Sequence, residues 1–275
     1  TGRGVDRRFD AAAVIPGAAL LVLGGFYRQN YHQWGQAKRS PPEKASGMKI
    51  TTTVFAAALV AVPSVTFAQG FVGAELSGSM MAYSSDTDLG ETMYNGGLEF
   101  GIVPGLSVAA DFAYHGFRGL DGNSSTLTVH GLYDLTQTAT VGLFYGQDRR
   151  DAGDSELYGI EGATTLSGIA VDGYLGQFDG DMGTGMLLGV NGAFAFTDAI
   201  SATASAGIIN GDENWKRISI GGEYQFGNGP TVFAEVGKYD GDVDGENFIS
   251  IGARIELGQG TTFGPRGITE ILPGF

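Results

Sequence analysis

The sequence has 275 residues, a formal net charge of −14 and no cysteine. The absence of cysteine excludes a disulfide framework, a thiolate metal site and a cysteine nucleophile. The negative charge argues against nucleic acid as a partner, because phosphate binding needs a basic surface.

The charge divides the chain into two pieces. Residues 1–68 hold eight Lys and Arg against three Asp and Glu, whereas residues 69–275 hold eight against 27. Residues 1–47 begin at Thr1 and do not resemble the rest of the chain, so we interpret them as an upstream segment that is not part of the native protein. The apolar stretch 11–27 leaves a second reading open, an upstream membrane segment.

Residues 48–68 have the three parts of a secretory signal peptide. Lys49 supplies the positive charge, residues 54–62 the apolar region, and Thr66-Phe67-Ala68 a small-x-small cleavage site. The apolar region is shorter than the ~20 residues that a membrane-spanning helix needs. The sequence therefore predicts export, with cleavage between Ala68 and Gln69.

From Gln69 onward, apolar and polar residues alternate in repeated runs. In ISIGGEYQF, for example, every second side chain is apolar or aromatic, which is the period of a β-strand with one apolar face. About ten residues per run suits a tilted strand that crosses a bilayer. The twelve runs are 72–76, 94–102, 106–114, 127–135, 141–145, 158–166, 169–175, 186–196, 200–208, 218–226, 232–236 and 249–257.

The connections between the runs alternate in kind. Short turns of turn-forming residues are Val103-Pro104-Gly105, Thr136-Gln137-Thr138, Ser167-Gly168, Thr197-Asp198-Ala199 and Asn228-Gly229-Pro230. Longer, acidic connections are predicted at 84–91, 118–125, 147–156, 179–183, 210–214 and 239–247. Short turns at one end and longer loops at the other predict an outer-membrane barrel with its long loops outside the cell.

The composition of the two faces indicates which one points outward. The polar face is rich in Gly, Ala and Ser, and the apolar face carries aromatic residues toward the strand ends, as in the aromatic girdles of membrane barrels. We therefore predict an all-β, antiparallel, transmembrane up-and-down barrel over residues 69–257. Residues 258–275 are predicted to follow it either as a partly paired strand or as a tail that tucks into the lumen. The alternative is a secreted, water-soluble barrel or sandwich with its apolar face inside.

The chain resembles the small, Gly-rich outer-membrane porins found in alphaproteobacteria. The resemblance covers about residues 71–257 and is carried by the signal peptide, strands such as LYGIEGAT and ISIGGEYQF, the acidic loops and the terminal Phe275. It implies insertion by the outer-membrane assembly machinery, which recognises a final strand ending in Phe. General porins have more strands and a long loop folded into the pore, so bulk diffusion is not implied.

The inward face is expected to carry more acids than bases, which would favour cations in a channel. Inward Gly and Ala leave volume unfilled, which favours an open, water-filled lumen. The alternative is a closed barrel, plugged by its own side chains, with a structural or adhesion role through its acidic loops. The candidate lumen residues are Glu75, Glu99, Asp111, His115, His130, Asp134, Glu161, Asp172, Arg217, Glu223, Glu235, Arg254 and Glu256.

Few other features indicate chemistry. Asp240, Asp242 and Asp244 resemble the start of a calcium loop, but its twelfth position is Ile251 rather than the bidentate Glu. No nucleophile-elbow motif accompanies the histidines, so no enzyme is predicted, and no cofactor is implied. Expected partners are small solutes, outer-membrane lipid, lipopolysaccharide and further copies of the chain in a homo-oligomer.

Overall fold

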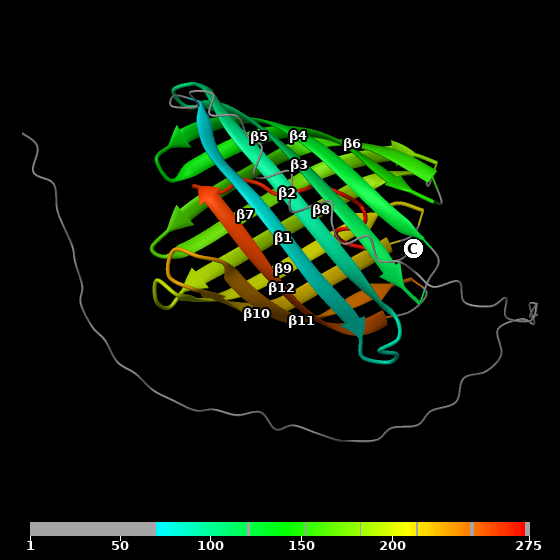
Figure 1. Cartoon of the computed structure of the whole chain (residues 1–275). Coiled ribbons are helices and arrows are strands. Elements are labelled where there is room, and N and C mark those ends of the chain that lie inside the picture. The colour runs from blue at the N-terminus through cyan, green and yellow to red at the C-terminus, as the bar shows by residue number, and fades with distance from the viewer. Residues whose placement is uncertain are drawn as a thin grey trace, which may run out of the picture. The chain divides into compact units, whose positions relative to one another are not determined.

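The computed structural model describes residues 70–119, 122–151, 153–181, 183–212, 214–242 and 245–272. These residues form one closed antiparallel barrel of twelve strands, each paired with its neighbours in sequence (Figure 1). The strands are β1 (Phe71–Tyr83), β2 (Gly90–Val103), β3 (Leu106–Arg118), β4 (Asn123–Thr136), β5 (Ala139–Arg150), β6 (Gly153–Leu166), β7 (Ile169–Gly180), β8 (Gly183–Ala195), β9 (Ile200–Asn210), β10 (Asn214–Gln225), β11 (Thr231–Gly241) and β12 (Gly245–Gly258). The predicted twelve-stranded up-and-down barrel is confirmed.

Some sequence-based predictions cannot be compared with this structure. The upstream segment, the signal peptide and the cleavage site between Ala68 and Gln69 lie outside the described residues. In the part of the chain that is described, no helix is long and apolar enough to cross a membrane.

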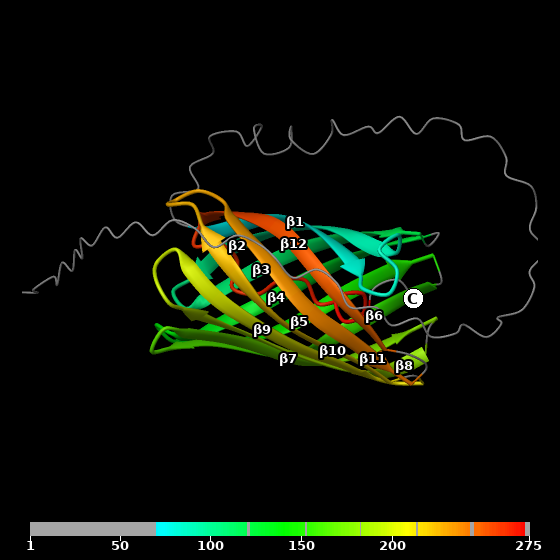
Figure 2. The ribbon, with the colours of Figure 1, turned by 90° about the horizontal axis from the view of Figure 1, so that it is seen from below.

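The barrel is closed by pairing of its first and last strands. β1 and β12 run antiparallel from Gly73 opposite Gly258 to Tyr83 opposite Phe248. The strands are tilted steeply, and a view turned by 90° shows the seam between β1 and β12 from another side (Figure 2). Closure leaves no open sheet edge, which is the condition for a sheet to cross a bilayer.

The alternation of side chains places the apolar face outside. On β10, Ile218 and Ile220 are 59% and 66% exposed, whereas Trp215 and Ser219 point inward and are buried. Aromatic pairs lie on the outer face near the turns: Phe194 and Phe196 have ring centroids 4.9 Å apart, and Tyr224 and Phe226 4.7 Å. An apolar outer surface of this extent indicates lipid rather than water around the barrel. The predicted orientation of the faces is confirmed.

Several of the predicted short turns appear with the backbone that their residues favour. Ser167 and Gly168 connect β6 to β7, and both have positive φ, 53° and 83°. Two successive residues with positive φ form the type I′ turn, whose twist matches that of the paired strands. Gly105 has φ 79° in the turn between β2 and β3, where a side chain would be strained.

The predicted contrast between short turns and long acidic loops is wrong. β5 extends to Arg150 and β6 begins at Gly153, so most of the predicted loop 147–156 is paired strand. The connections at this end span two to six residues, against two to five at the other end. The charged residues of the predicted loops continue the two-residue period, and strands that pass beyond the lipid tolerate them without losing their backbone pairing.

The outer face generates a prediction about depth in the membrane. Changing Ile220 to Arg places a charge on the lipid face near the middle of β10 and should destabilise the folded barrel by about 2–4 kcal/mol. Changing Tyr224 to Arg, near the end of the same strand, should cost only about 0–1 kcal/mol. Urea unfolding in lipid vesicles measures both, and equal losses would contradict a lipid-facing β10.

Candidate functional site

Residues 259–272, here called the inner segment, enter the lumen of the barrel. The segment follows β12 and is the red coil enclosed by the strands in both views (Figures 1 and 2). Gly258 and Gly260, with φ of 67° and 73°, turn the chain back, and a Cβ on Gly73 would overlap the backbone of Gly260. Residues 258–275 were predicted to form either a partial strand or a segment tucked into the lumen. The described residues 259–272 are tucked into the lumen.

The first contacts of the inner segment are with β2 and β3. The backbone N–H of Thr262 donates to Glu99 Oε2 at 2.8 Å, and Ser107 Oγ donates to the other oxygen of Glu99 at 2.9 Å. Phe263 packs against Ala109 and Leu132 in a small apolar cluster. The carboxylate predicted to face water thus holds the chain's own backbone.

Arg266 is bound on the inward face of β6 and β7 by Glu161, Asp172 and Tyr174, which together are called the guanidinium seat. Its Nε donates to Glu161 Oε2 at 2.9 Å and its Nη2 to Asp172 Oδ2 at 3.4 Å. The guanidinium lies 4.4 Å from the ring centroid of Tyr174, and the residue is 3% exposed. Burial alone would lower the pKa of Arg266, but the charges of Glu161 and Asp172 outweigh it and raise the pKa, so the guanidinium stays charged.

Asp148, on β5, holds the segment further along. It accepts hydrogen bonds from the backbone N–H groups of Ile268 and Thr269 at 3.0 and 3.2 Å, and from Thr126 Oγ1 at 3.2 Å. Its side chain is fully buried. The sequence reasoning missed Asp148 because it placed residues 147–156 in a loop, although its two-residue spacing from Gly142, Phe144 and Gly146 assigns it to the inward face.

The end of the inner segment builds an apolar cluster inside the barrel. Ile268, Ile271 and Leu272 pack with inward side chains of β5 to β10, among them Leu187 and Trp215. A Cβ on Gly207 would lie 2.9 Å from Ile271, so the small inward residue makes room for the segment rather than for water. The volume left by inward glycines, which favoured an open lumen, is partly filled by the chain itself.

Both predicted lumen histidines lie between two carboxylates. His130 Nε2 is 2.9 Å from Asp111 and its Nδ1 is 2.6 Å from Glu161. His115 Nδ1 contacts Glu91, and its Nε2 is 3.2 Å from Glu270 of the inner segment. Each histidine therefore bridges acids that would otherwise repel each other. The predicted lumen residue Asp134 lies apart from this network, near the barrel mouth, where it accepts a hydrogen bond from Thr140 at 2.7 Å.

In the wall formed by β10, β11 and β12, the acids pair with arginines of the same strands. Arg217 donates to Glu235 at 2.6 Å, and Ser219 donates to the other oxygen of Glu235 at 2.7 Å. Arg254 donates to both oxygens of Glu223, at 3.2 and 3.1 Å. Arg254 Nε also lies 2.7 Å from Glu256 and 4.0 Å from Glu75, so three of the predicted lumen carboxylates meet at one guanidinium.

Two small cavities are lined in part by this wall. One, of about 80 Å³, is lined by Asp198, Glu223, Glu256 and Arg254, near the turn between β8 and β9. The other, of about 70 Å³, is lined by Glu91, Glu235 and Glu270 together with Arg217 and His115. Each cavity has room for a few water molecules. In each, three carboxylates face a single arginine.

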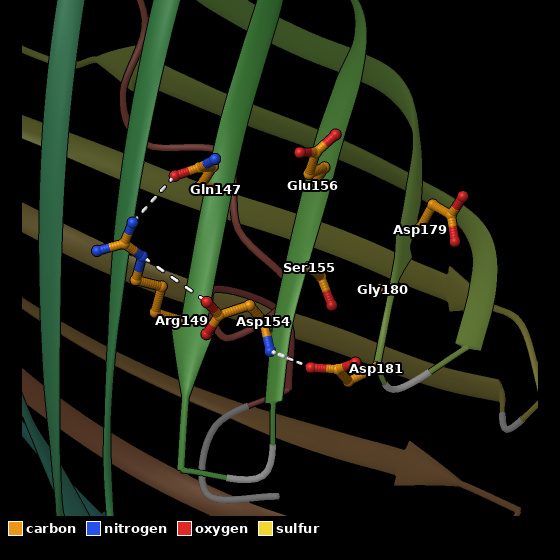
Figure 3. A pocket seen from close by; sticks show the side chains of 8 residues that line it. All are labelled: Gln147, Arg149, Asp154, Ser155, Glu156, Asp179, Gly180 and Asp181. Atoms are coloured by element: carbon orange, nitrogen blue, oxygen red, sulfur yellow. Dashed lines mark hydrogen bonds and ion pairs between the residues drawn. The ribbon is translucent and has the colours of Figure 1, made fainter.

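A larger hollow, of about 410 Å³, lies at the ends of β5, β6 and β7 (Figure 3). Arg149 and Asp154 face each other across it with Nε and Oδ2 3.9 Å apart, and Asp181 accepts a hydrogen bond from the backbone N–H of Asp154 at 3.3 Å. Arg149, Asp154 and Glu156 occupy outward positions of their strands. This hollow therefore belongs to the rim of the barrel and not to the lumen.

The calcium candidates are not brought together with further ligands. Asp240 pairs with Lys238 Nζ at 2.9 Å, and Asp242 accepts hydrogen bonds from the backbone and side-chain N–H groups of Asn214. Asp244 lies outside the described residues. Among the residues that are described, no group of three or more His, Cys, Asp or Glu could hold a metal ion. Phe275, which was predicted to end the signal for the assembly machinery, also lies outside them.

Comparison with known families identifies the class of protein. Residues 95–244 match the family described as Gram-negative porin. The match covers more than half of the chain, so the chain belongs to the Gram-negative porin family, a family of outer-membrane channels. The Gly-rich alphaproteobacterial subtype stays a prediction. No curated protein matches the sequence.

Solved structures of outer-membrane channels have a similar fold. The NanC porin superposes with a TM-score of 0.53 at 10% identity, over 67% of this chain and 100% of that chain. An outer membrane channel from Pseudomonas putida F1 gives 0.49 at 11% identity, over 69% and 96% of the two chains. The KdgM porin in complex with disordered oligogalacturonate gives 0.48 at 9% identity, over 67% and 98%. At these identities the likeness concerns the fold alone.

The contacts of Asp148 generate a prediction about the inner segment. Changing Asp148 to Ala removes the charged acceptor of two backbone N–H groups, each bond contributing about 1.5–3 kcal/mol. The amides of Ile268 and Thr269 should then exchange their hydrogens about 10- to 100-fold faster. Hydrogen exchange followed by mass spectrometry measures this rate. Asp179, an exposed outward carboxylate on β7, provides the control: the same change there should leave both amides protected.

Proposed function

We propose that this porin is a narrow outer-membrane channel that passes small cations in preference to anions. The path follows the wall of β10, β11 and β12, which contributes residues to both lumen cavities; β1 to β3 and the inner segment complete the lining of one of them. Much of the wall from β2 to β7 is covered by the inner segment through Glu99, Asp148 and Glu161. A path confined to one side of a twelve-stranded barrel admits ions and small molecules rather than bulk solutes.

The observation that carries the cation preference is the excess of carboxylates in both cavities. Three acids and one arginine line each of them, and the second adds only a histidine that is itself bonded to two carboxylates. Carboxylates around a constriction attract cations and repel anions, and the low dielectric of the surrounding wall strengthens the field. Arg217 and Arg254 neutralise part of this charge without reversing it.

The inner segment favours a second candidate function, a closed barrel with a structural or interaction role. Arg266 and the apolar cluster around Ile271 fill the centre of the lumen, as a plug would. In this reading the cavities hold only trapped water, and the connections between strands make the functional contacts. Binding of lipopolysaccharide, recognition by the assembly machinery and association with further copies stay predictions under either function.

Selectivity measurements test the first proposal. In planar bilayers under a potassium chloride gradient, the wild-type reversal potential should have the sign of potassium permeation. Changing both Asp198 to Asn and Glu256 to Gln should lower the cation-to-anion permeability ratio at least about threefold, because one charge about 6 Å from an ion contributes about 0.7 kcal/mol in water.

The control is Asp179→Asn, which removes an acid of the rim hollow without touching the lumen. It should leave the reversal potential unchanged. An unaltered ratio in the double variant would contradict the path along β10–β12. A barrel that inserts and passes no current would replace the channel by the closed scaffold.

A further inference from the structure

The wall that holds the inner segment has the features of a peptide-binding site. We call Glu99, Thr128, Asp148, Glu161 and Asp172 the acceptor strip. These inward residues of β2, β4, β5, β6 and β7 all make hydrogen bonds with the inner segment. The strip runs from the end where the segment enters the lumen to the buried Asp148 contacts.

Three members of the strip accept hydrogen bonds from backbone N–H groups of the inner segment, and Asp148 also accepts one from Thr269 Oγ1 at 3.3 Å. Glu99 accepts from the N–H of Thr262, Thr128 Oγ1 from the N–H of Arg266 at 3.0 Å, and Asp148 from two successive N–H groups. The direction of a backbone N–H group depends on backbone conformation, and residues 268–272 form a turn in which the N–H groups of Ile271 and Leu272 donate to the carbonyl of Ile268 at 3.0 and 2.9 Å. These contacts therefore recognise the backbone conformation of the inner segment more than its side chains.

The other two members select one side chain. Glu161 and Asp172 receive different nitrogens of the Arg266 guanidinium, and Tyr174 lies against its face. A planar guanidinium offers donors in fixed directions and an apolar face, whereas a lysine ammonium offers neither. The seat therefore distinguishes arginine from lysine.

The barrel does not need the inner segment to complete its own sheet. β12 pairs with β1 through Gly258, and every strand has its two neighbours before the segment begins. The segment has no regular strand or helix of its own over 259–272. Its removal from the strip would leave the backbone pairing of the barrel intact and would expose several carboxylates to the lumen.

We propose that the acceptor strip is a binding site for arginine-containing peptides that adopt the backbone conformation of the inner segment, and that the inner segment occupies this site in cis. An external peptide enters the lumen by taking the place of the inner segment, so the proposal does not depend on the ion path along β10–β12. The attached segment behaves as a ligand at an effective concentration on the order of millimolar. A free peptide therefore competes poorly with the intact segment. It competes well once the binding of the segment to the strip is weakened.

The test uses the full chain with Arg266→Ala, which empties the guanidinium seat but keeps the strip. The probe is a fluorescently labelled synthetic peptide with the sequence of residues 259–272, and its binding to the detergent-solubilised barrel is followed by fluorescence anisotropy. Binding to Arg266→Ala should be at least tenfold tighter than binding to the wild type. Replacing the probe's arginine by lysine should weaken binding at least tenfold.

Two seat variants complete the design. Adding Glu161→Gln to Arg266→Ala should abolish the tenfold gain in probe binding. Because Glu161 also contacts His130, Asp172→Asn provides a milder second variant, which should also weaken probe binding. Folding of each variant is checked by its heat-dependent shift on gels. Arg149→Ala, at an exposed rim arginine, should bind the probe as the wild type does.

The outcomes separate this proposal from the channel function. Equal probe binding by the wild type, Arg266→Ala and the seat variants would overturn the peptide site, and so would equal binding of the arginine and lysine probes. The anisotropy readout needs no current. A barrel that fails to conduct yet shows the expected ratios would disprove the ion path while leaving the acceptor strip as a binding site.

Discussion

The structure depends on the completion of backbone hydrogen bonding around the barrel. In lipid each unpaired N–H or C=O costs several kcal/mol, so β1 must pair with β12 as fully as any two neighbours do. Once twelve strands close in this register, the two-residue period decides which side chains face lipid and which face the lumen. The lumen that results is narrow enough for one stretch of chain, residues 259–272, to cover much of its wall.

Charge inside the barrel is balanced in two different ways. On the side of β10 to β12, Arg217 and Arg254 are part of the wall and neutralise its acids permanently. On the side of β2 to β7, Glu161 and Asp172 receive their arginine from a segment outside the sheet. A buried carboxylate without a partner is costly, so this second wall favours either the inner segment or a cationic replacement for it. Under the two proposals, this difference between the walls separates a fixed, acidic ion path from an exchangeable peptide-binding surface.

Much of the fold could be predicted because its signal is local. The alternation around Ile218 and Ile220 indicates both the strand and its outward face, and repetition of that pattern gives the number of strands. The strand ends could not be predicted as well: Asp148, Arg149 and Arg150 look like a polar loop, yet they continue the ladder of β5. The polar composition of this stretch indicates that its side chains are exposed to water. It does not indicate where the strand ends, because backbone pairing continues as long as the neighbouring strand continues.

The candidate site was predictable only in part. Period and position placed Glu99, Asp111, Glu161 and Glu223 on the inward face, where they are found. Their partners were not predictable, since Arg266 meets Glu161 across 105 positions of sequence and Ile268 meets Asp148 across 120. No period links such residues, and the segment from 259 onward lacks any regular pattern. Only closure of the barrel brings them together.

The position of the inner segment in the chain restricts the order in which the molecule can be assembled. It directly follows β12, the strand whose pairing with β1 seals the barrel. A stretch that is enclosed by the wall and attached to the sealing strand has two routes inside. Either it is already laid against β2 to β7 when the seam forms, so that the wall closes around it, or it is threaded lengthwise afterwards through the open end beside Gly258. In the first case Glu161 and Asp172 pair with Arg266 before the barrel is complete. Closure of β12 onto β1 then forms the last backbone hydrogen bonds and encloses the inner segment in the same step.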